Sequence, residues 1–97
     1  MSSEPSLRGR ALGYLARREH SRLELEKKLT PYASTVEELS SMLDLLERDG
    51  FLSAERMVEQ IVHIRRNRFG SRRIVYELQQ KGIDEELISA VLPRLKE

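Results

Sequence analysis

The chain has 97 residues, with 17 Lys and Arg against 16 Asp and Glu, 39% hydrophobic residues, three Tyr, two Phe and no Cys. This length allows one small domain or two very small ones, and so short and charged a chain cannot enclose a large dry cavity for catalysis. The absence of Cys excludes disulfides, thiol catalysis and cysteine-based zinc sites. We therefore expect a binding or regulatory module that is not an enzyme and has no cofactor.

No apolar run approaches the ~20 residues that a membrane-spanning helix needs. The first residues also lack the apolar core of a signal peptide. These two observations predict a cytoplasmic protein that does not enter a membrane.

The net charge of +1 is a cancellation between blocks of opposite sign. Residues 1–22 carry +3 and residues 56–81 carry +5, whereas residues 23–55 carry −5 and residues 82–97 carry −2. A fold that brings the two basic blocks together would form a positive face.

Residues 1–52 predict a flexible N-terminus, residues 1–6, followed by a three-helix unit, residues 7–52. Ser6 is expected to cap the first helix. The other two helices begin with capping boxes, in which a hydroxyl and a Glu side chain bind each other's backbone amide. The boxes are Ser21-Arg22-Leu23-Glu24 and Thr35-Val36-Glu37-Glu38. The first of these helices is expected to run to about Leu29, where Pro31 stops it, and the second to end at Gly50.

The same order of signals returns in residues 53–97 and predicts a second three-helix unit, with Ser53, Ser71 and Asp84 as caps. Short matches relate the two halves at offsets of 50, 53 and 48 residues for the first, second and third helix. We interpret this as a tandem three-helix repeat. The expected fold is therefore all-α, with six helices in a solenoid-like stack.

Two segments resemble the RecX family, the bacterial modulators of the RecA recombinase. Residues 11–29, ALGYLARREHSRLELEKKL, are similar to the opening repeat of that family, and residues 69–83, FGSRRIVYELQQKGI, to its second-repeat signature. The resemblance covers about residues 7–95 and implies tandem three-helix repeats, commonly three. A third repeat is missing here, so we expect a fragment or a naturally short form.

The resemblance also implies a function and a partner. A RecX-like chain would bind the RecA nucleoprotein filament and inhibit recombination and ATP turnover. Direct contact with single-stranded DNA is a further expectation. The apolar stripe of the last helix could also support self-association.

The strongest local signal is the segment Arg65-Arg66-Asn67-Arg68-Phe69-Gly70-Ser71-Arg72-Arg73, which has five arginines at a predicted helix junction. Their guanidinium groups can bind phosphates or carboxylates bidentately, although cations near a helix C-terminus are also an ordinary surface feature. Helical projection places Arg65 and Arg68 on the buried stripe. Arg65 is therefore expected either to pair with Glu47, Asp49 or Glu77 or to bind a partner. Lys81 completes this basic group.

A second basic group contains Arg8 and Arg10 and, at or near the corresponding junction of the first unit, Arg17, Arg18 and Arg22. Repeated geometry would align the two groups on one face that suits DNA phosphates or an acidic protein groove. An ordinary solvated surface is the alternative for Arg17, Arg18 and Arg22.

Other polar and aromatic residues are expected to have no binding role. His20 and His63 lack companions at metal-ligand spacing and are predicted to lie on the surface. Asp44 and Glu47 are expected on a solvated acidic helix face and not as an acid/base pair. The aromatic residues Tyr14, Tyr32, Phe69 and Tyr76 are expected at core edges and helix junctions, because they are not interleaved with basic residues on one strand face.

A small helix-turn-helix nucleic-acid-binding protein is the alternative function. Residues 71–80 would be its recognition helix, with Arg72 and Arg73 at the end that enters the major groove. Against this, much of that helix is apolar and no Asn or Gln lies early enough in it to read base edges. A plain helical assembly adaptor is a third reading that the sequence cannot separate from the others.

Overall fold

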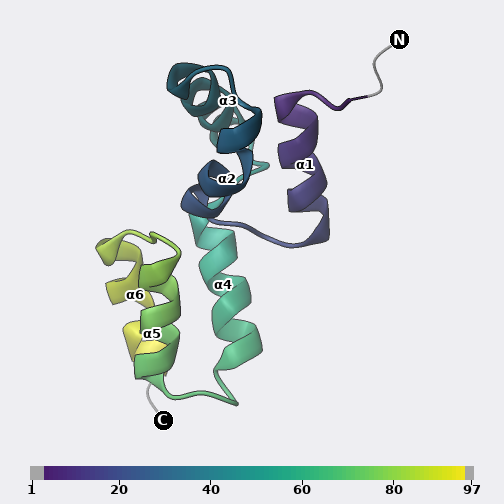
Figure 1. Ribbon diagram of the computed structural model, residues 1–97. Helices are drawn as coiled ribbons and strands as arrows, with labels where there is room; N and C mark the ends of the chain where they lie inside the picture. The colour runs from purple at the N-terminus through teal and green to yellow at the C-terminus, as the bar shows by residue number, and fades with distance from the viewer. Residues whose placement is uncertain (1–3, 96–97) are drawn as a thin grey trace. The chain divides into compact units, whose positions relative to one another are not determined.

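A computed structural model describes residues 4–95, which form six α-helices, one short 3-10 helix and no strand. These residues divide into two compact units between Ser53 and Ala54, each with three α-helices (Figure 1). The predicted all-α class and six helices are confirmed. A solenoid-like stack of the units stays a prediction, and the flexible N-terminus predicted for residues 1–6 lies partly outside the described residues.

The first unit contains α1 (Leu7–Arg17), α2 (Arg22–Leu29), η1 (Thr30–Tyr32) and α3 (Val36–Arg48). Its predicted caps form: Ser6 accepts the Gly9 amide of α1 at 3.0 Å, and Ser21 and Glu24 make the complete capping box of α2. At α3, Thr35 accepts the Glu38 amide, but the Glu38 carboxylate accepts from the Ser34 amide and not from that of Thr35. Of the two hydrogen bonds expected in the second capping box, only the one from the Glu38 amide to the Thr35 hydroxyl forms.

The core of the first unit is aliphatic and comes from all three of its α-helices. Ala11 supplies the close contact from α1, while leucines fill the rest of the cluster. Gly50, with φ of +83°, ends α3 and turns the chain so that Leu52 returns to this core. The buried residues are Ala11, Leu25, Leu29, Leu39, Leu43, Leu46 and Leu52.

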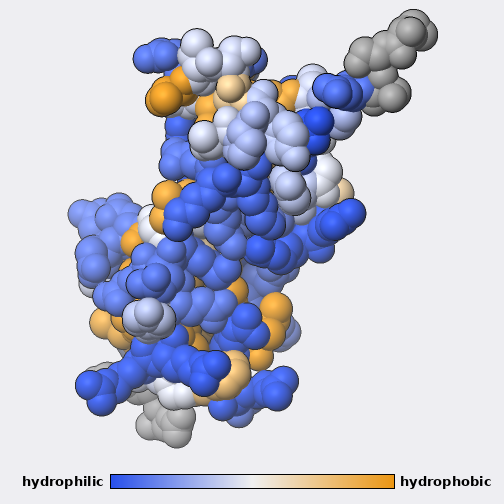
Figure 2. Space-filling model, viewed as in Figure 1, coloured by the Kyte–Doolittle hydropathy of each residue, from blue (hydrophilic) through white to orange (hydrophobic). Residues whose placement is uncertain are grey.

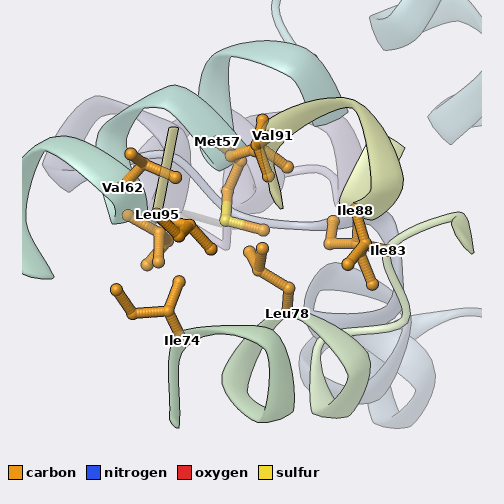
Figure 3. Close-up of a cluster of buried hydrophobic side chains, with 10 residues drawn as sticks. Met57, Val62, Ile74, Leu78, Ile83, Ile88, Val91 and Leu95 are labelled. Carbon is orange, nitrogen blue, oxygen red and sulfur yellow. The ribbon is translucent and has the colours of Figure 1, made fainter. Parts of the chain in front are cut away.

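The second unit contains α4 (Ala54–Arg65), α5 (Ser71–Gln80) and α6 (Glu85–Leu95). Side chains from all three helices, and Ile83 from the turn before α6, point toward one another in its core (Figure 3). The apolar side chains of α6 are largely used here: Ile88, Val91 and Leu95 are buried, and Leu92 is exposed. Among the described residues of α6, Leu92 is the only large apolar residue that is exposed, and self-association through this helix stays a prediction.

Ser71 does not cap α5 as predicted. The N-cap residue is Gly70, which has no side chain to accept a hydrogen bond, and Ser71 is already the first helical residue. The error arises because Gly and Ser are both common at this position, and the two residues are adjacent here.

The two units repeat with a spacing that differs from the matches in the sequence. The buried residues Leu25 and Leu29 of α2 correspond to Ile74 and Leu78 of α5, each 49 residues further on. The caps Ser21 and Thr35 are related by the same spacing to Gly70 and to Asp84, whose carbonyl accepts the Ile88 amide at the start of α6. The starts of the second and third helices are thus 49 residues apart, whereas the sequence matches gave offsets of 53 and 48 residues.

Candidate functional site

The turn from α4 into α5 gathers the arginines of the second unit. Arg65, the last residue of α4, donates from Nε and Nη2 to the two carboxylate oxygens of Glu77 on α5, at 2.9 and 3.2 Å. This hydrogen-bonded pair raises the pKa of Arg65. One of the three expected ion-pair partners is thus confirmed, and the pair ties the two helices together.

Four other arginines of this turn and of the first turn of α5 are exposed. None of them takes part in an ion pair within residues 4–95. Arg68 is among them although helical projection placed it on the buried stripe, because α4 ends at Arg65 and the projection no longer applies. Hydrophilic side chains cover most of this end of the second unit (Figure 2). The four residues are Arg66, Arg68, Arg72 and Arg73.

Aromatic side chains lie beside these arginines. The Arg73 guanidinium lies 4.1 Å from the centre of the Phe69 ring, and the Arg65 guanidinium lies 6.0 Å from it. The Tyr76 side chain, one turn along α5 from Arg73, is exposed. Together with Gln80 and Lys81 these residues line an open hollow of about 600 Å³. Lys81 and Arg73 therefore line the same hollow, which agrees with the prediction that Lys81 belongs to this basic group.

The corresponding arginines of the first unit are mostly paired. Arg18 forms an ion pair with Glu24 at 2.9 Å, whereas Arg17 is exposed and takes part in no ion pair within residues 4–95. Arg22 contacts Asp44 and Glu47 of α3, each at 2.7 Å. Burial alone would lower the pKa of Arg22, but these two hydrogen bonds raise it.

The Arg22 contacts change the expectation for two acidic residues. Asp44 and Glu47 are not simply a solvated acidic face, since together they hold a guanidinium that also donates to the Ser40 carbonyl at 3.2 Å. This cluster joins α2 to α3. Of the first unit's predicted site residues, only Arg17 is thus left without an acidic partner.

His20 is buried, contrary to its predicted surface position; only 2% of it is exposed. Its Nδ1 lies 3.0 Å from the Arg18 carbonyl and its Nε2 lies 3.2 Å from Lys28 Nζ. Burial lowers the pKa of His20, and the positive charges of Arg18 and Lys28 lower it further. The hydrogen bond to the Arg18 carbonyl raises the pKa, but by less than these effects lower it. His63 is exposed, as predicted.

One of the four aromatic predictions is wrong. Phe69 and Tyr14 are half-buried, and Tyr32 lies in η1 at the junction of α2 and α3 with 53% of it exposed, but Tyr76 lies within α5 and is 62% exposed. The sequence shows Tyr76 between the apolar residues of α5, and only the helix register reveals that it faces outward beside Arg72 and Arg73. Sequence reasoning therefore missed the one exposed ring that lies within the arginine-rich region.

Among the residues that the structure describes, no group of three or more His, Asp or Glu could hold a metal ion. No helix in the described part of the chain is long and apolar enough to cross a membrane.

Two three-helix units in tandem, the second with unpaired arginines where its first two helices meet, define a small helical repeat protein. The model for the second three-helix domain of RecX matches residues 55–92, which lie in the second unit. The chain belongs to the RecX family, as its sequence motifs predicted.

Curated relatives match over most of this chain, and each is named Regulatory protein RecX. The protein of Ralstonia pickettii is 46% identical over 91 residues, which are 94% of this chain and 57% of that protein. The proteins of Herbaspirillum seropedicae and Leptothrix cholodnii are 50% and 48% identical, over 87% and 94% of this chain and over 54% and 58% of their own lengths. The chain therefore spans a little over half the length of these relatives.

Proposed function

We propose that the chain is a non-enzymatic, cytoplasmic regulator that binds the RecA nucleoprotein filament and inhibits its recombinase and ATPase activities. The observation that carries the proposal is the 44–50% identity, across 84 to 91 residues, to proteins named Regulatory protein RecX. Regulation of RecA is the role that this resemblance implies for the two repeats.

The exposed arginines of the second unit support a binding role. Arg66, Arg68, Arg72 and Arg73 have no acidic partner among residues 4–95, so binding would not first have to break an internal ion pair. A guanidinium can donate two parallel hydrogen bonds to a carboxylate of a protein surface or to a phosphate of a bound strand. Arg17 would add one more such group in the first unit.

The helix-turn-helix alternative has weaker support. In the first two turns of α5 the exposed side chains are Arg72, Arg73 and Tyr76. The first exposed side-chain amide is that of Gln79, in the last turn. Helices that read the major groove place their base-reading side chains near the N-terminal end. Duplex recognition by α5 would therefore depend on two arginines.

The test is the ATPase activity of RecA on single-stranded DNA with increasing concentrations of this chain. We expect the activity to fall and the double variant Arg66→Gln/Arg68→Gln to need an about five- to thirtyfold higher concentration, because two exposed ion pairs contribute about 1–2 kcal/mol. The double variant Lys27→Gln/Arg48→Gln removes the same charge from exposed residues of the first unit and should leave the inhibition unchanged. Unaltered RecA activity at saturating concentrations of the chain would overturn the proposal.

A further inference from the structure

The first unit has an apolar hollow at the connection between α2 and α3, and the second unit has an exposed isoleucine, Ile64, that is followed by unpaired arginines. We propose that these two features bind each other between two copies of the chain, with Ile64 of one copy seated in the hollow of another. The contact is heterologous, because it joins two different surfaces. It goes beyond the regulation of RecA and does not rest on it, since it needs no protein other than this chain.

The hollow in the first unit is the receiving surface. It has a volume of about 410 Å³, and the aliphatic part of its lining comes from Ala33, Val36 and Leu39. Val36, the first residue of α3, is 79% exposed, which is the largest exposed fraction of any large hydrophobic residue that the structure describes. An aliphatic side chain placed in this hollow would remove its own surface and that of Val36 from water, which favours binding.

Carboxylates border the hollow. Glu26 is part of its lining and contacts the Arg22 guanidinium at 3.4 Å. Asp44 and Glu47 contact the same guanidinium at 2.7 Å, so three carboxylates against one guanidinium leave this cluster with a charge of −2. Glu37, in the first turn of α3, is exposed and has no ion-pair partner within residues 4–95. The hollow therefore favours an apolar side chain with positive charge beside it.

The end of α4 has these matching features. Ile64 is the last residue but one of α4 and is 51% exposed. Arg66 and Arg68 follow it within four residues, and both are exposed without an acidic partner among residues 4–95. Their guanidinium groups can donate to the carboxylates around the hollow, while the isoleucine side chain fills it.

The charges of the two regions are also complementary over a longer range. Residues 23–55, which contain the hollow, carry −5, and residues 56–81, which contain the end of α4, carry +5. Such opposite charges attract two copies at low salt, and salt weakens the attraction because the Debye length is only about 10 Å at 0.1 M. The surfaces involved are small, so the association should be weak and should depend on protein concentration.

The chain contains no cysteine, so single introduced cysteines can report which residues meet. A disulfide needs Cα atoms within about 7 Å of each other, so residues in contact cross-link faster than residues that meet only by collision. The experiment oxidises an equimolar mixture of Val36→Cys and Ile64→Cys, one of them tagged, at low salt. We expect the mixed dimer to form at least about tenfold faster than in a mixture of Leu45→Cys and Ile64→Cys, and raised salt should slow it. Leu45 is the matched control, because it is another exposed apolar residue of α3.

Equal rates in the two mixtures would overturn the proposal. The double variant Val36→Cys/Ile64→Cys then separates contact between copies from contact within one chain. Cross-linked dimers or larger species support the proposal. A cross-linked monomer at low protein concentration would overturn it, because the two residues would then meet within a single chain.

Sedimentation velocity of the unaltered chain measures the association itself. We expect the sedimentation coefficient to rise with protein concentration at low salt and to fall toward that of the monomer at about 1 M salt, where the Debye length is about 3 Å. Ile64→Gln should weaken the association by about three- to tenfold, because about half of the isoleucine is still free to be buried. Leu92→Gln, at an exposed leucine of α6, should not weaken it. A chain that stays monomeric, or an association lost in Leu92→Gln but not in Ile64→Gln, would overturn the proposal, and the RecA ATPase measurement would stand independently of either result.

Discussion

At the scale of single residues, His20 is the one titratable residue among the described residues that is buried, with 2% of it exposed. A backbone carbonyl can only accept, so the contact with the Arg18 carbonyl places the proton on Nδ1, and Nε2 then accepts from the Lys28 ammonium at 3.2 Å. The ring also lies 5.7 Å from that of Tyr14, centre to centre. A second proton on His20 would set a cation against the Lys28 ammonium, so this site stabilises neutral histidine.

This environment predicts a stability that falls in mild acid. The pKa of His20 is lowered in the folded chain from its ordinary 6.5, so the unfolded chain takes up a proton first as the pH falls. The contribution is favourable to folding above about pH 6.5 and is lost as the pH falls toward the folded pKa, at no more than about 1.4 kcal/mol per pH unit. Urea unfolding between about pH 8 and pH 5 should show this loss.

The matched variants are His20→Gln and His63→Gln. His20→Gln should flatten that part of the pH profile, whereas His63→Gln should not, because His63 is exposed. A profile unchanged by His20→Gln would show that other groups cause the loss of stability.

The burial and pairing of a residue could be predicted from the sequence only where they do not depend on how separate helices pack. The pairing of Arg65 with Glu77 could be expected, because an arginine near a buried helical stripe needs a carboxylate. The burial of His20 could not, because the contacts that cover it come from Tyr14 on α1 and Lys28 on α2, and only the packing of these helices brings them to the connection. The exposure of Tyr76 likewise depended on the register of α5.

At the scale of the helices, two glycines with open surroundings differ in backbone conformation. An added Cβ would meet nothing within 4 Å at Gly50 or at Gly13, so neither substitution creates a clash with a neighbouring side chain. Gly50 has φ of +83° after α3, whereas Gly13 lies within α1. The backbone conformation at each position therefore decides whether an alanine there raises or lowers the free energy of unfolding.

We expect Gly50→Ala to lower the free energy of unfolding by about 1–2 kcal/mol, because an L-residue is strained in the left-handed region. Gly13→Ala should raise it by about 0.5–1 kcal/mol, because alanine loses less backbone entropy in a helix. Urea midpoints at an unchanged m-value measure both changes. A stabilised Gly50→Ala variant would mean that α3 ends differently from the turn described above.

The helices themselves were largely predictable because their signals are local. Ser6 and the pair of Ser21 and Glu24 cap helices within four residues of their own position, and a sequence shows such motifs directly. The repeat spacing was harder to obtain. At the spacing of 49 residues the buried Leu25 corresponds to Ile74, which differs in residue type, whereas the identical Leu78 lies 53 residues after Leu25.

At the scale of the whole molecule, residues 4–95 form two hydrophobic cores, and the buried residues of each core come from one unit. The buried cluster of the first unit ends at Leu52 and that of the second begins at Met57. Units of this size bury a small fraction of their surface and have little stability to spare. A large substitution in one core should therefore unfold that unit and not the other.

Leu43→Ala and Ile74→Ala test this separation, because both side chains are almost fully buried, one in each core. Each substitution should cost its own unit about 2–5 kcal/mol. Hydrogen exchange should then show lost protection in α1–α3 for Leu43→Ala and in α4–α6 for Ile74→Ala, with the other unit changed by less than about twofold. Equal loss of protection in both units would show instead that the two repeats fold as one cooperative structure, as stacked repeats do when their interface supplies most of the stability.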